Sequence, residues 1–501
     1  MTNTIDSGFD IAAPRPEALI QSLRAFGYDL STAIADIVDN SISASAKNIA
    51  IDFFWNGEDS YISIQDDGCG MSEEELINAM RPGSRSPLEE RSPKDLGRFG
   101  LGLKTASFSQ CKKLTVASKT NDGNFAVRCW DLDYVTEHGE WRLLRSASTT
   151  MQHLIDKAPD TPSGTIVLLE NLDRLTKDTK VDSRHDHDKF LEDAEKVKNH
   201  LAMVFHRYLE RINGPKFTVN SRPVKPWDPF LTSEPATQNL TEEAHHILGG
   251  KLVVKPYVLP HVSKISQEVH SRAAGPKGWN AQQGFYVYRN SRLLVAGEWL
   301  GLGFQKEEHY KLARILLDIP NSMDEHWEID VKKSRAYPPV ALRRELKRLA
   351  EVTRQRAADV YRHRGKIIAR QHAGKFSYTW DRKITHGKIS YKINREHPFI
   401  KSLLDRQDVS KEVSNLLKLI EETVPVPTIM VDNAESPGKQ AQPFEQAAEG
   451  EVKRLATDIY RILLIERTES EAIEAIQTME PFNQYTDDLV PYLKGLERSA
   501  V

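Results

Sequence analysis

Three short stretches of this chain carry polar residues and glycines at spacings that suit chemistry on a phosphorylated ligand. They are AIADIVDNSISA (residues 33–44), QDDGCGM (65–71) and GRFGLGLKTASFS (97–109). The first places an acid and an amide on one helix face, the second puts a carboxylate in a glycine-rich turn, and the third has a lysine after a glycine-rich loop. Each stretch alone is a weak signal, but the three in this order predict a nucleotide pocket.

Asp36 and Asn40 are four residues apart, so on a helix both side chains lie on one face, one turn from each other. A carboxylate there can orient and deprotonate a water molecule. An amide oxygen can ligate Mg²⁺, which prefers oxygen donors. An isolated pair of this kind is more often a solvated helix face. Here the opposite face is continuously apolar, which indicates a packed helix whose polar face is directed at something.

The second stretch puts Asp66 at the end of a predicted strand, followed by Gly68 and Gly70, which permit close approach of the backbone to a ligand. A buried carboxylate there can accept a hydrogen bond from an exocyclic amine such as that of adenine, although the letters DDG alone more often mark an ordinary turn.

In the third stretch, glycines at 97, 100 and 102 precede Lys104. Successive backbone N–H groups and a helix N-terminus form an anion cradle, to which the lysine adds a point charge. The P-loop pattern is absent and no βαβ unit surrounds the glycines, so the P-loop and dinucleotide folds are disfavoured.

The elements around these residues predict an α+β sandwich, with helices on one face of a sheet. We expect Ser31 to cap the helix that carries Asp36, and Ser72 with Glu75 to form a capping box for a later helix. The segment Arg81–Lys94 is polar and rich in Pro, Gly and Ser, which indicates a loop. Alternating residues predict strands at 48–55, 61–65, 112–120, 125–133 and 164–170.

Length and composition set broad limits. A chain of 501 residues is too long for one compact core, so several domains are expected. A hydrophobic content of 39%, a charged content of 28% and a formal net charge of −3 are ordinary for a soluble globular protein. No apolar run is long enough for a membrane span, and the three cysteines form no spaced pair. We therefore expect a reduced, cytoplasmic protein without a membrane segment.

Taken together, the stretches resemble the motifs of the GHKL ATPases, the class that includes gyrase-type topoisomerase subunits, MutL mismatch-repair proteins, ninety-kilodalton heat-shock chaperones, sensor histidine kinases and MORC proteins. AIADIVDNSISA is similar to the N box, DDGCGM to the first glycine box and GRFGLGLKTAS to the second. GTIVLLEN (164–171) is similar to the strand that carries the adenine-side threonine. The resemblance implies a Bergerat-type fold, a mixed sheet covered by helices, that binds ATP with Mg²⁺.

The resemblance also implies a role for each matching residue. Asn40 would bind Mg²⁺. Asp66 would bind the adenine amine, and Arg81–Lys94 would be the ATP lid. The purine side of the pocket would be formed by Gly68, Gly70, Met71 and Thr165. The phosphates would be wrapped by Gly97, Gly100, Leu101, Gly102, Leu103 and Lys104.

One departure from the class concerns Asp36, which stands where hydrolysing members usually have Glu. The shorter side chain withdraws the carboxylate by about one methylene, on the order of 1.5 Å. A misplacement of that size can cost about a hundredfold in rate. Either the helix sits closer to the phosphate or hydrolysis is slow. Asp39 is a less favourable base, because it points about 100° away from Asn40 around the helix.

Two later segments resemble the transducer domain that follows the ATPase domain in gyrase, MutL and MORC proteins. GFYVYRNSRLLVAG (284–297) is similar to a strand pair of that domain. HWEIDVKKSRAYPP (326–339) is similar to the segment that brings a lysine to the ATP γ-phosphate. This match gives Lys333 a catalytic role, with Lys332 as the alternate, and a solvated basic turn is the other interpretation.

Residues 341–401 hold 17 Lys or Arg against five Asp or Glu, a local balance of +12. One interpretation is a solvated helix whose charges pair with acids elsewhere in the chain. A surplus this concentrated favours a surface for the phosphate backbone. Because no base-reading motif accompanies it, the prediction is DNA contact without sequence preference.

The sequence thus predicts five parts: a GHKL ATPase domain (1–225), a transducer domain (226–345), a basic helical region (346–424), a linker (425–446) and a C-terminal helical region (447–501). Resemblance to prokaryotic MORC/MutL-like proteins implies a clamp that becomes a homodimer on ATP and acts on DNA in a restriction or phage-defence system. No metal-endonuclease motif occurs, so DNA cutting would belong to a nuclease or helicase partner. The alternatives are a chaperone-like or scaffolding ATPase, and an ATP sensor with little hydrolysis.

Overall fold

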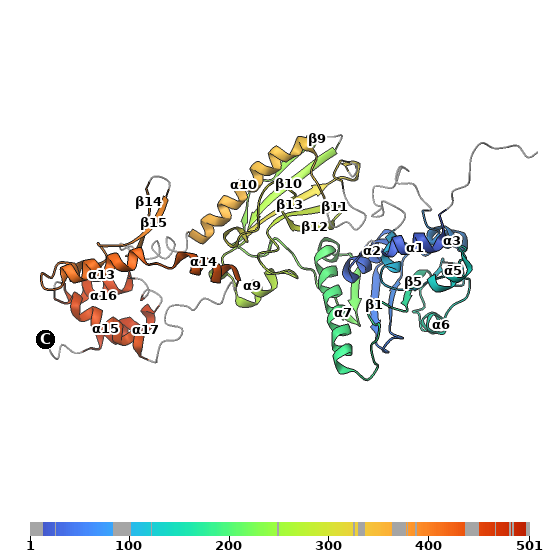
Figure 1. Ribbon diagram of the computed structural model, residues 1–501, viewed down its shortest axis with the longest axis horizontal. Coiled ribbons are helices and arrows are strands. Elements are labelled where there is room, and N and C mark those ends of the chain that lie inside the picture. The colour runs from blue at the N-terminus through green and yellow to red at the C-terminus, as the bar shows by residue number, and fades with distance from the viewer. Residues whose placement is uncertain are drawn as a thin grey trace, which may run out of the picture. The chain divides into compact units, whose positions relative to one another are not determined.

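The computed structural model of the chain describes residues 14–25, 27–83, 102–121, 123–247, 250–323, 326–328, 336–362, 377, 379–385, 388–435, 450–465, 467–479, 482 and 485–496. The chain divides into two compact units, Met1–Asp359 and Val360–Val501. The first unit contains two sheets, and the second is mainly helical (Figure 1).

The first sheet has seven strands in the order β4-β3-β5-β2-β1-β6-β7. Neighbouring strands are antiparallel except for the parallel pair β1–β6. The strands are β1 (Asn48–Phe54), β2 (Tyr61–Asp66), β3 (Lys113–Lys119), β4 (Ala126–Asp131), β5 (Gly164–Glu170), β6 (Lys216–Val219) and β7 (Arg222–Pro223). The five strands predicted in this region are confirmed to within a few residues.

Helices cover this sheet on both faces. They are α1 (Pro16–Arg24), α2 (Leu30–Ser43), α3 (Glu73–Met80), α4 (Gly102–Phe108), α5 (Leu132–His138), α6 (Thr149–Asp156), α7 (Arg184–Val204) and α8 (His206–Leu209). Val167 and Leu169 of β5 join the large core shared with α2 and α7. Ile166 and Leu168 point to the other side and pack with Met151 of α6. The mixed sheet covered by helices is confirmed, whereas the expectation that helices lie on one face only is wrong.

The two helix starts expected from capping residues differ in outcome. Helix α3 begins with the predicted capping box, in which the Ser72 hydroxyl accepts from the Glu75 N–H and the Glu75 carboxylate accepts from the Ser72 N–H. Helix α2 is capped by Asp29, whose carboxylate accepts from the backbone N–H of Thr32 at 3.0 Å. The predicted cap, Ser31, lies inside the helix.

The second sheet of this unit has six strands in the order β12-β11-β13-β10-β8, with β9 also paired to β10. Its strands are β8 (Gln238–Asn239), β9 (Glu243–Ile247), β10 (Gly250–Val258), β11 (Gly284–Arg289), β12 (Arg292–Glu298) and β13 (Ala313–Ile319). Helices α9 (Gln267–Ala273) and α10 (Val340–Arg362) accompany it. Figure 1 shows α10 running alongside this sheet, and Leu342, Leu346 and Leu349 are buried on one side of the helix.

The second unit contains a hairpin, β14 (Trp380–Thr385) and β15 (Lys388–Ile393), and six helices among its described residues. The helices are α12 (Pro398–Leu404), α13 (Ser410–Glu422), α14 (Val426–Glu435), α15 (Glu451–Leu463), α16 (Glu469–Gln477) and α17 (Thr486–Lys494). Two predictions need correction here: the region 346–424 is not wholly helical, because it holds the hairpin, and the linker 425–446 contains α14. Among the described residues, no helix is long and apolar enough to cross a membrane.

Candidate nucleotide site

The site is built around Asp66, the last residue of β2. The residue is only 9% exposed. One carboxylate oxygen accepts from the Ser41 hydroxyl of α2 at 2.7 Å, and the other accepts from the backbone N–H of Gly68 at 2.9 Å. Burial raises the pKa of Asp66, while these two hydrogen bonds favour the ionised form and oppose the rise. The carboxylate is therefore held rigidly at the strand end by the helix and by the turn.

The turn after Asp66 requires glycine at position 70. Gly70 has φ +68°, in the left-handed region. A Cβ atom there would lie 1.8 Å from the carbonyl oxygen of Lys119, at the end of β3. Gly68 is also enclosed, since an added Cβ would lie 2.7 Å from the Cβ of Ala44. The turn is thus pressed between α2 and β3, with no room for side chains at these positions.

A row of polar side chains crosses the sheet beside this turn. In the strand register Asp66 lies opposite Thr165, and Thr165 lies opposite Ser118. The Thr165 and Ser118 hydroxyls are 2.8 Å apart, and the Ser118 hydroxyl accepts from the backbone N–H of Met71 at 2.9 Å. The structure therefore brings together Asp66, the turn and Thr165, as the sequence predicted. It adds Ser41 and Ser118, which sequence reasoning missed.

Helix α2 places Asn40 and Asp36 in different environments. Asn40 is exposed near the C-terminal end of the helix. The side chain of Asp36 is 1% exposed: one oxygen accepts from the Tyr28 hydroxyl at 3.1 Å and the other from Nη2 of Arg292 at 3.2 Å. Nε of the same arginine donates to both oxygens of Asp39, at 2.8 and 2.9 Å. Both acids of α2 are thus bound to an arginine of the second sheet, a contact that sequence reasoning missed.

Lys104 lies in α4 and is 3% exposed. Its ammonium group donates to the backbone carbonyl of Ala79, near the end of α3, at 2.9 Å. Gly102 and Leu103 form the start of α4. The other predicted phosphate-side residues, Gly97, Gly100 and Leu101, lie outside the described residues, as do Lys332, Lys333 and the lid beyond residue 83.

The residues present fit a magnesium ion at one position of this site. The exposed amide of Asn40 offers an oxygen ligand of the type that Mg²⁺ prefers. Bound there, the ion would neutralise phosphate charge.

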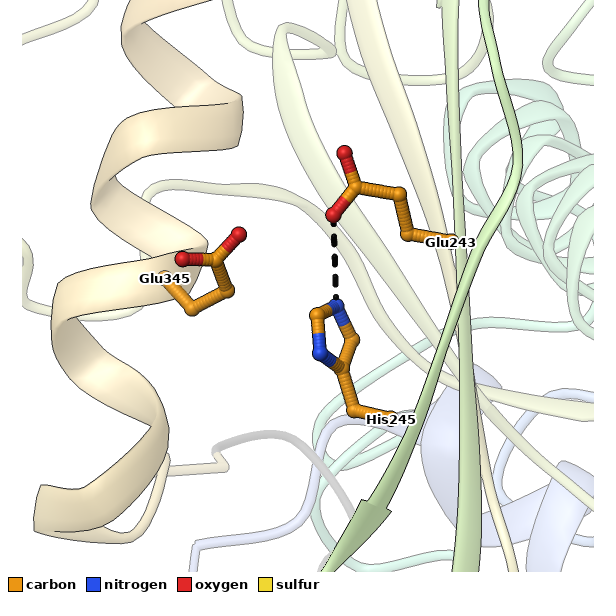
Figure 2. Close-up of side chains that lie close together, drawn as sticks. All are labelled: Glu243, His245 and Glu345. Carbon is orange, nitrogen blue, oxygen red and sulfur yellow. Dashed lines mark ion pairs between the residues drawn. The ribbon is translucent and has the colours of Figure 1, made fainter.

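A separate cluster of possible metal ligands lies on the second sheet. Glu243 and His245 of β9 and Glu345 of α10 face one another (Figure 2), and one ligand atom from each lies within 4.8 Å of the others. Nε2 of His245 is 3.5 Å from a carboxylate oxygen of Glu243. Arg348 donates to both oxygens of Glu243 at 2.7 Å and to Glu345. Because the arginine already balances these carboxylates, the cluster is explained as an ion-pair network that ties α10 to β9.

The basic side chains of residues 341–401 form more ion pairs than the composition suggested. Arg348 binds Glu243 and Glu345, and Arg354 is 8% exposed. The Arg354 guanidinium contacts Glu307 at 3.1 Å and lies over the ring of Tyr310, 3.9 Å from its centroid. The other ion pairs among the described residues of 341–401 are Lys392 with Glu421 and Glu422, Arg395 with Glu421, and Lys401 with Glu396. The exposed cations of the region with no ion pair among the described residues include Arg344, Lys347 and Arg356 of α10.

Comparison with known proteins agrees with this geometry. Residues 28–165 match the family described as histidine kinase-, DNA gyrase B- and HSP90-like ATPase. ATPase morc-1 of Caenorhabditis elegans is 33% identical over 88 residues, which are 18% of this chain and 10% of that protein. DNA mismatch repair protein MutL of Pelotomaculum thermopropionicum is 36% identical over 101 residues, 19% of this chain and 16% of that protein. MutL of Dictyoglomus turgidum is 37% identical over 100 residues, 19% of this chain and 17% of that protein.

The solved N-terminal domain of a DNA repair protein aligns over 70% of this chain and 99% of its own, at 16% identity and a low TM-score of 0.41. The fold and the family match define residues 28–165 as an ATPase-type domain of the GHKL class. The MORC and MutL relatives that match belong to two of the groups whose motifs the sequence resembles. The matched segments span at most about a fifth of the length of these MORC and MutL relatives.

Proposed function

We propose that this protein binds ATP together with Mg²⁺ in the site centred on Asp66. The observation that carries the proposal is the row of Asp66, Thr165 and Ser118 beside a turn that tolerates only glycine at position 70. A buried carboxylate whose position is fixed by two donors selects a ligand that offers an N–H, as the adenine amine does. Asn40 would hold the magnesium ion, and Gly68, Gly70 and Met71 would line the purine.

Hydrolysis forms the second part of the proposal. Asp36 acts as the general base, Lys333 contacts the γ-phosphate, and Lys104 with Gly97, Gly100, Leu101, Gly102 and Leu103 surrounds the phosphates. The Tyr28 hydroxyl and Nη2 of Arg292 each donate to the Asp36 carboxylate, and these hydrogen bonds orient the proposed base. Turnover is slow, since an aspartate is about one methylene shorter than glutamate and a shift of about 1 Å can cost on the order of a hundredfold. Asp36→Asn is expected to abolish hydrolysis and preserve nucleotide binding.

The third part concerns the assembly and its target. The relatives are named as a MORC ATPase and as DNA mismatch repair proteins, which favours a clamp that dimerises on ATP and acts on DNA. Nonspecific DNA contact would use the exposed cations of α10 within residues 341–401, and a nuclease or helicase partner in a restriction or phage-defence system would do any cutting. The extensive ion pairing of this region favours, as a second candidate, a scaffolding ATPase that closes on protein.

One experiment tests the assembly. The full-length protein is analysed by size-exclusion chromatography and ATPase assay with ADP, ATP and a non-hydrolysable analogue, with and without DNA. The clamp predicts a dimer with ATP or the analogue and a monomer with ADP. A monomer under every condition contradicts it.

The DNA target is tested by reversing charge in a triple variant, Arg344→Glu, Lys347→Glu and Arg356→Glu. A control variant reverses three exposed cations of the first domain, Lys177, Lys180 and Arg184, and so changes net charge equally. Salt-dependent DNA binding lost only in the first variant supports the DNA clamp. Binding that survives in the first variant, or that falls equally in both, excludes this surface.

A further inference from the structure

One buried arginine of the second sheet binds two acids of helix α2. Arg292 is the first residue of β12, and its side chain is 3% exposed. It donates to Asp39 from Nε and to Asp36 from Nη2, so one guanidinium binds two acids of the same helix. The planar fork of an arginine fixes the relative position of its partners, which a lysine ammonium cannot do. The Asp36 carboxylate is therefore oriented in part by a residue of the second sheet, together with the Tyr28 hydroxyl.

The hairpin that carries Arg292 is anchored firmly. At its tip, Asn290 and Ser291 both have positive φ, at 48° and 66°. The Tyr208 hydroxyl donates to the backbone carbonyl of Asn290 at 2.5 Å, and Arg211 donates to the Ser291 hydroxyl at 3.0 Å. A displacement of the β11–β12 hairpin would thus change its contacts with the α8 segment and with the acids of α2.

Asn40 lies one helical turn after Asp36 on α2, so the proposed magnesium ligand and the proposed base belong to one rigid element. A base that is oriented by a third group is a recurring arrangement in catalysis. We propose that Arg292 is a positioning residue that couples the second sheet to the nucleotide site by holding Asp36 in place. This inference rests on the proposed function, because it assigns Arg292 to the hydrolysis attributed to Asp36.

The test uses Arg292→Lys in the full-length protein. This change keeps the buried positive charge and loses only the planar, forked arrangement of the guanidinium N–H donors. The control is Arg207→Lys. Arg207 forms another ion pair of the same interface, with Asp318 at 2.8 Å, and lies over the ring of Tyr288. The control therefore repeats the same chemical change at the same interface, at an arginine whose partners lie in β13 and β11 rather than in α2.

Three readouts are taken on each protein. ATP binding is measured as protection of Cys69 from alkylation, since Cys69 is exposed in the turn and the other two cysteines are buried. Hydrolysis gives kcat and KM. Hydrogen exchange gives the change that the non-hydrolysable ATP analogue causes in residues 284–298, a measurement that does not depend on turnover.

For Arg292→Lys we expect unchanged protection of Cys69, an unchanged KM, a kcat lowered by about a hundredfold, and loss of the analogue-induced change in exchange. Arg207→Lys should match the wild type in all three. Wild-type kcat or a wild-type exchange response in Arg292→Lys overturns the coupling. If wild-type turnover is too slow to detect, the exchange response decides alone. If ATP does not protect Cys69 in the wild type, the proposed function fails and this inference fails with it.

Discussion

The substitution Asp66→Asn tests the adenine contact with little disturbance of the fold. Asparagine has nearly the same shape as aspartate. Its amide oxygen can accept from the Gly68 N–H, and its NH₂ group can donate to the Ser41 hydroxyl, so both internal hydrogen bonds, at 2.9 and 2.7 Å, survive. Removing a buried charge also relieves the desolvation that raises the pKa of Asp66. The free energy of unfolding should change by no more than about 1 kcal/mol.

Binding should respond more strongly than folding. A hydrogen bond to a charged group is worth about 1.5–3 kcal/mol, so the affinity for ATP should fall by about tenfold to 150-fold. Isothermal titration calorimetry measures the affinity, and urea unfolding measures the stability.

Asp67→Asn is the matched control. The Asp67 carboxylate accepts from the backbone N–H groups of Lys47 and Asn48, at 2.6 and 2.8 Å. It therefore forms hydrogen bonds within the protein and is not assigned to the nucleotide. This control should lose stability and keep its affinity for ATP. Wild-type affinity in Asp66→Asn, or an equal loss in both variants, would refute the assignment of the adenine contact.

Three more predictions follow from individual contacts, one in the turn of the site and two in other parts of the chain. Gly70→Ala forces a left-handed alanine at φ +68° with its Cβ 1.8 Å from the Lys119 carbonyl, so urea unfolding should show a loss of at least about 1–2 kcal/mol; an unaltered midpoint would contradict the close approach. Arg354→Ala removes a buried cation from the ring of Tyr310, and calorimetry should show a loss of about 2 kcal/mol with DNA affinity unchanged. Burial lowers the pKa of His397 from 6.5 to about 4, so the unfolded chain takes up the proton first and stability falls as pH drops from about 6.5 to 4. Between pH 7 and pH 5 the wild type should lose about 2 kcal/mol more than His397→Phe, and equal losses would argue against a neutral buried imidazole.

The parts of the site that were predictable are those specified by local sequence. Alternation placed the strand end at Asp66, and the serine–glutamate spacing placed the capping box of α3. The N-terminus of α2 was misplaced because Asp29 and Ser31 are both good capping residues; the helix begins at Leu30, which packs against the core.

Contacts between distant segments had no local signal. Ser118 reaches Thr165 because β3 and β5 are neighbours, an adjacency that the chain order does not reveal. Arg292 is more than two hundred residues from Asp36 in the sequence. The residues next to Arg292 are typical of an ordinary hairpin turn. In the second unit, composition misled the prediction: the Pro/Gln/Ser content of 425–446 obscured the helix α14.

ATP binding at the turn that follows Asp66 is the central claim, and the single exposed cysteine offers a direct test of it. Cys69 lies between the two glycines of that turn, whereas Cys111 and Cys129 are buried and burial raises the pKa of both thiols. Alkylation of the full-length protein should therefore report on Cys69. We predict that Mg²⁺-ATP slows the reaction in a concentration-dependent manner, that GTP does not, and that Asp66→Asn needs more ATP for the same protection. An alkylation rate that is the same with and without ATP would contradict the nucleotide site.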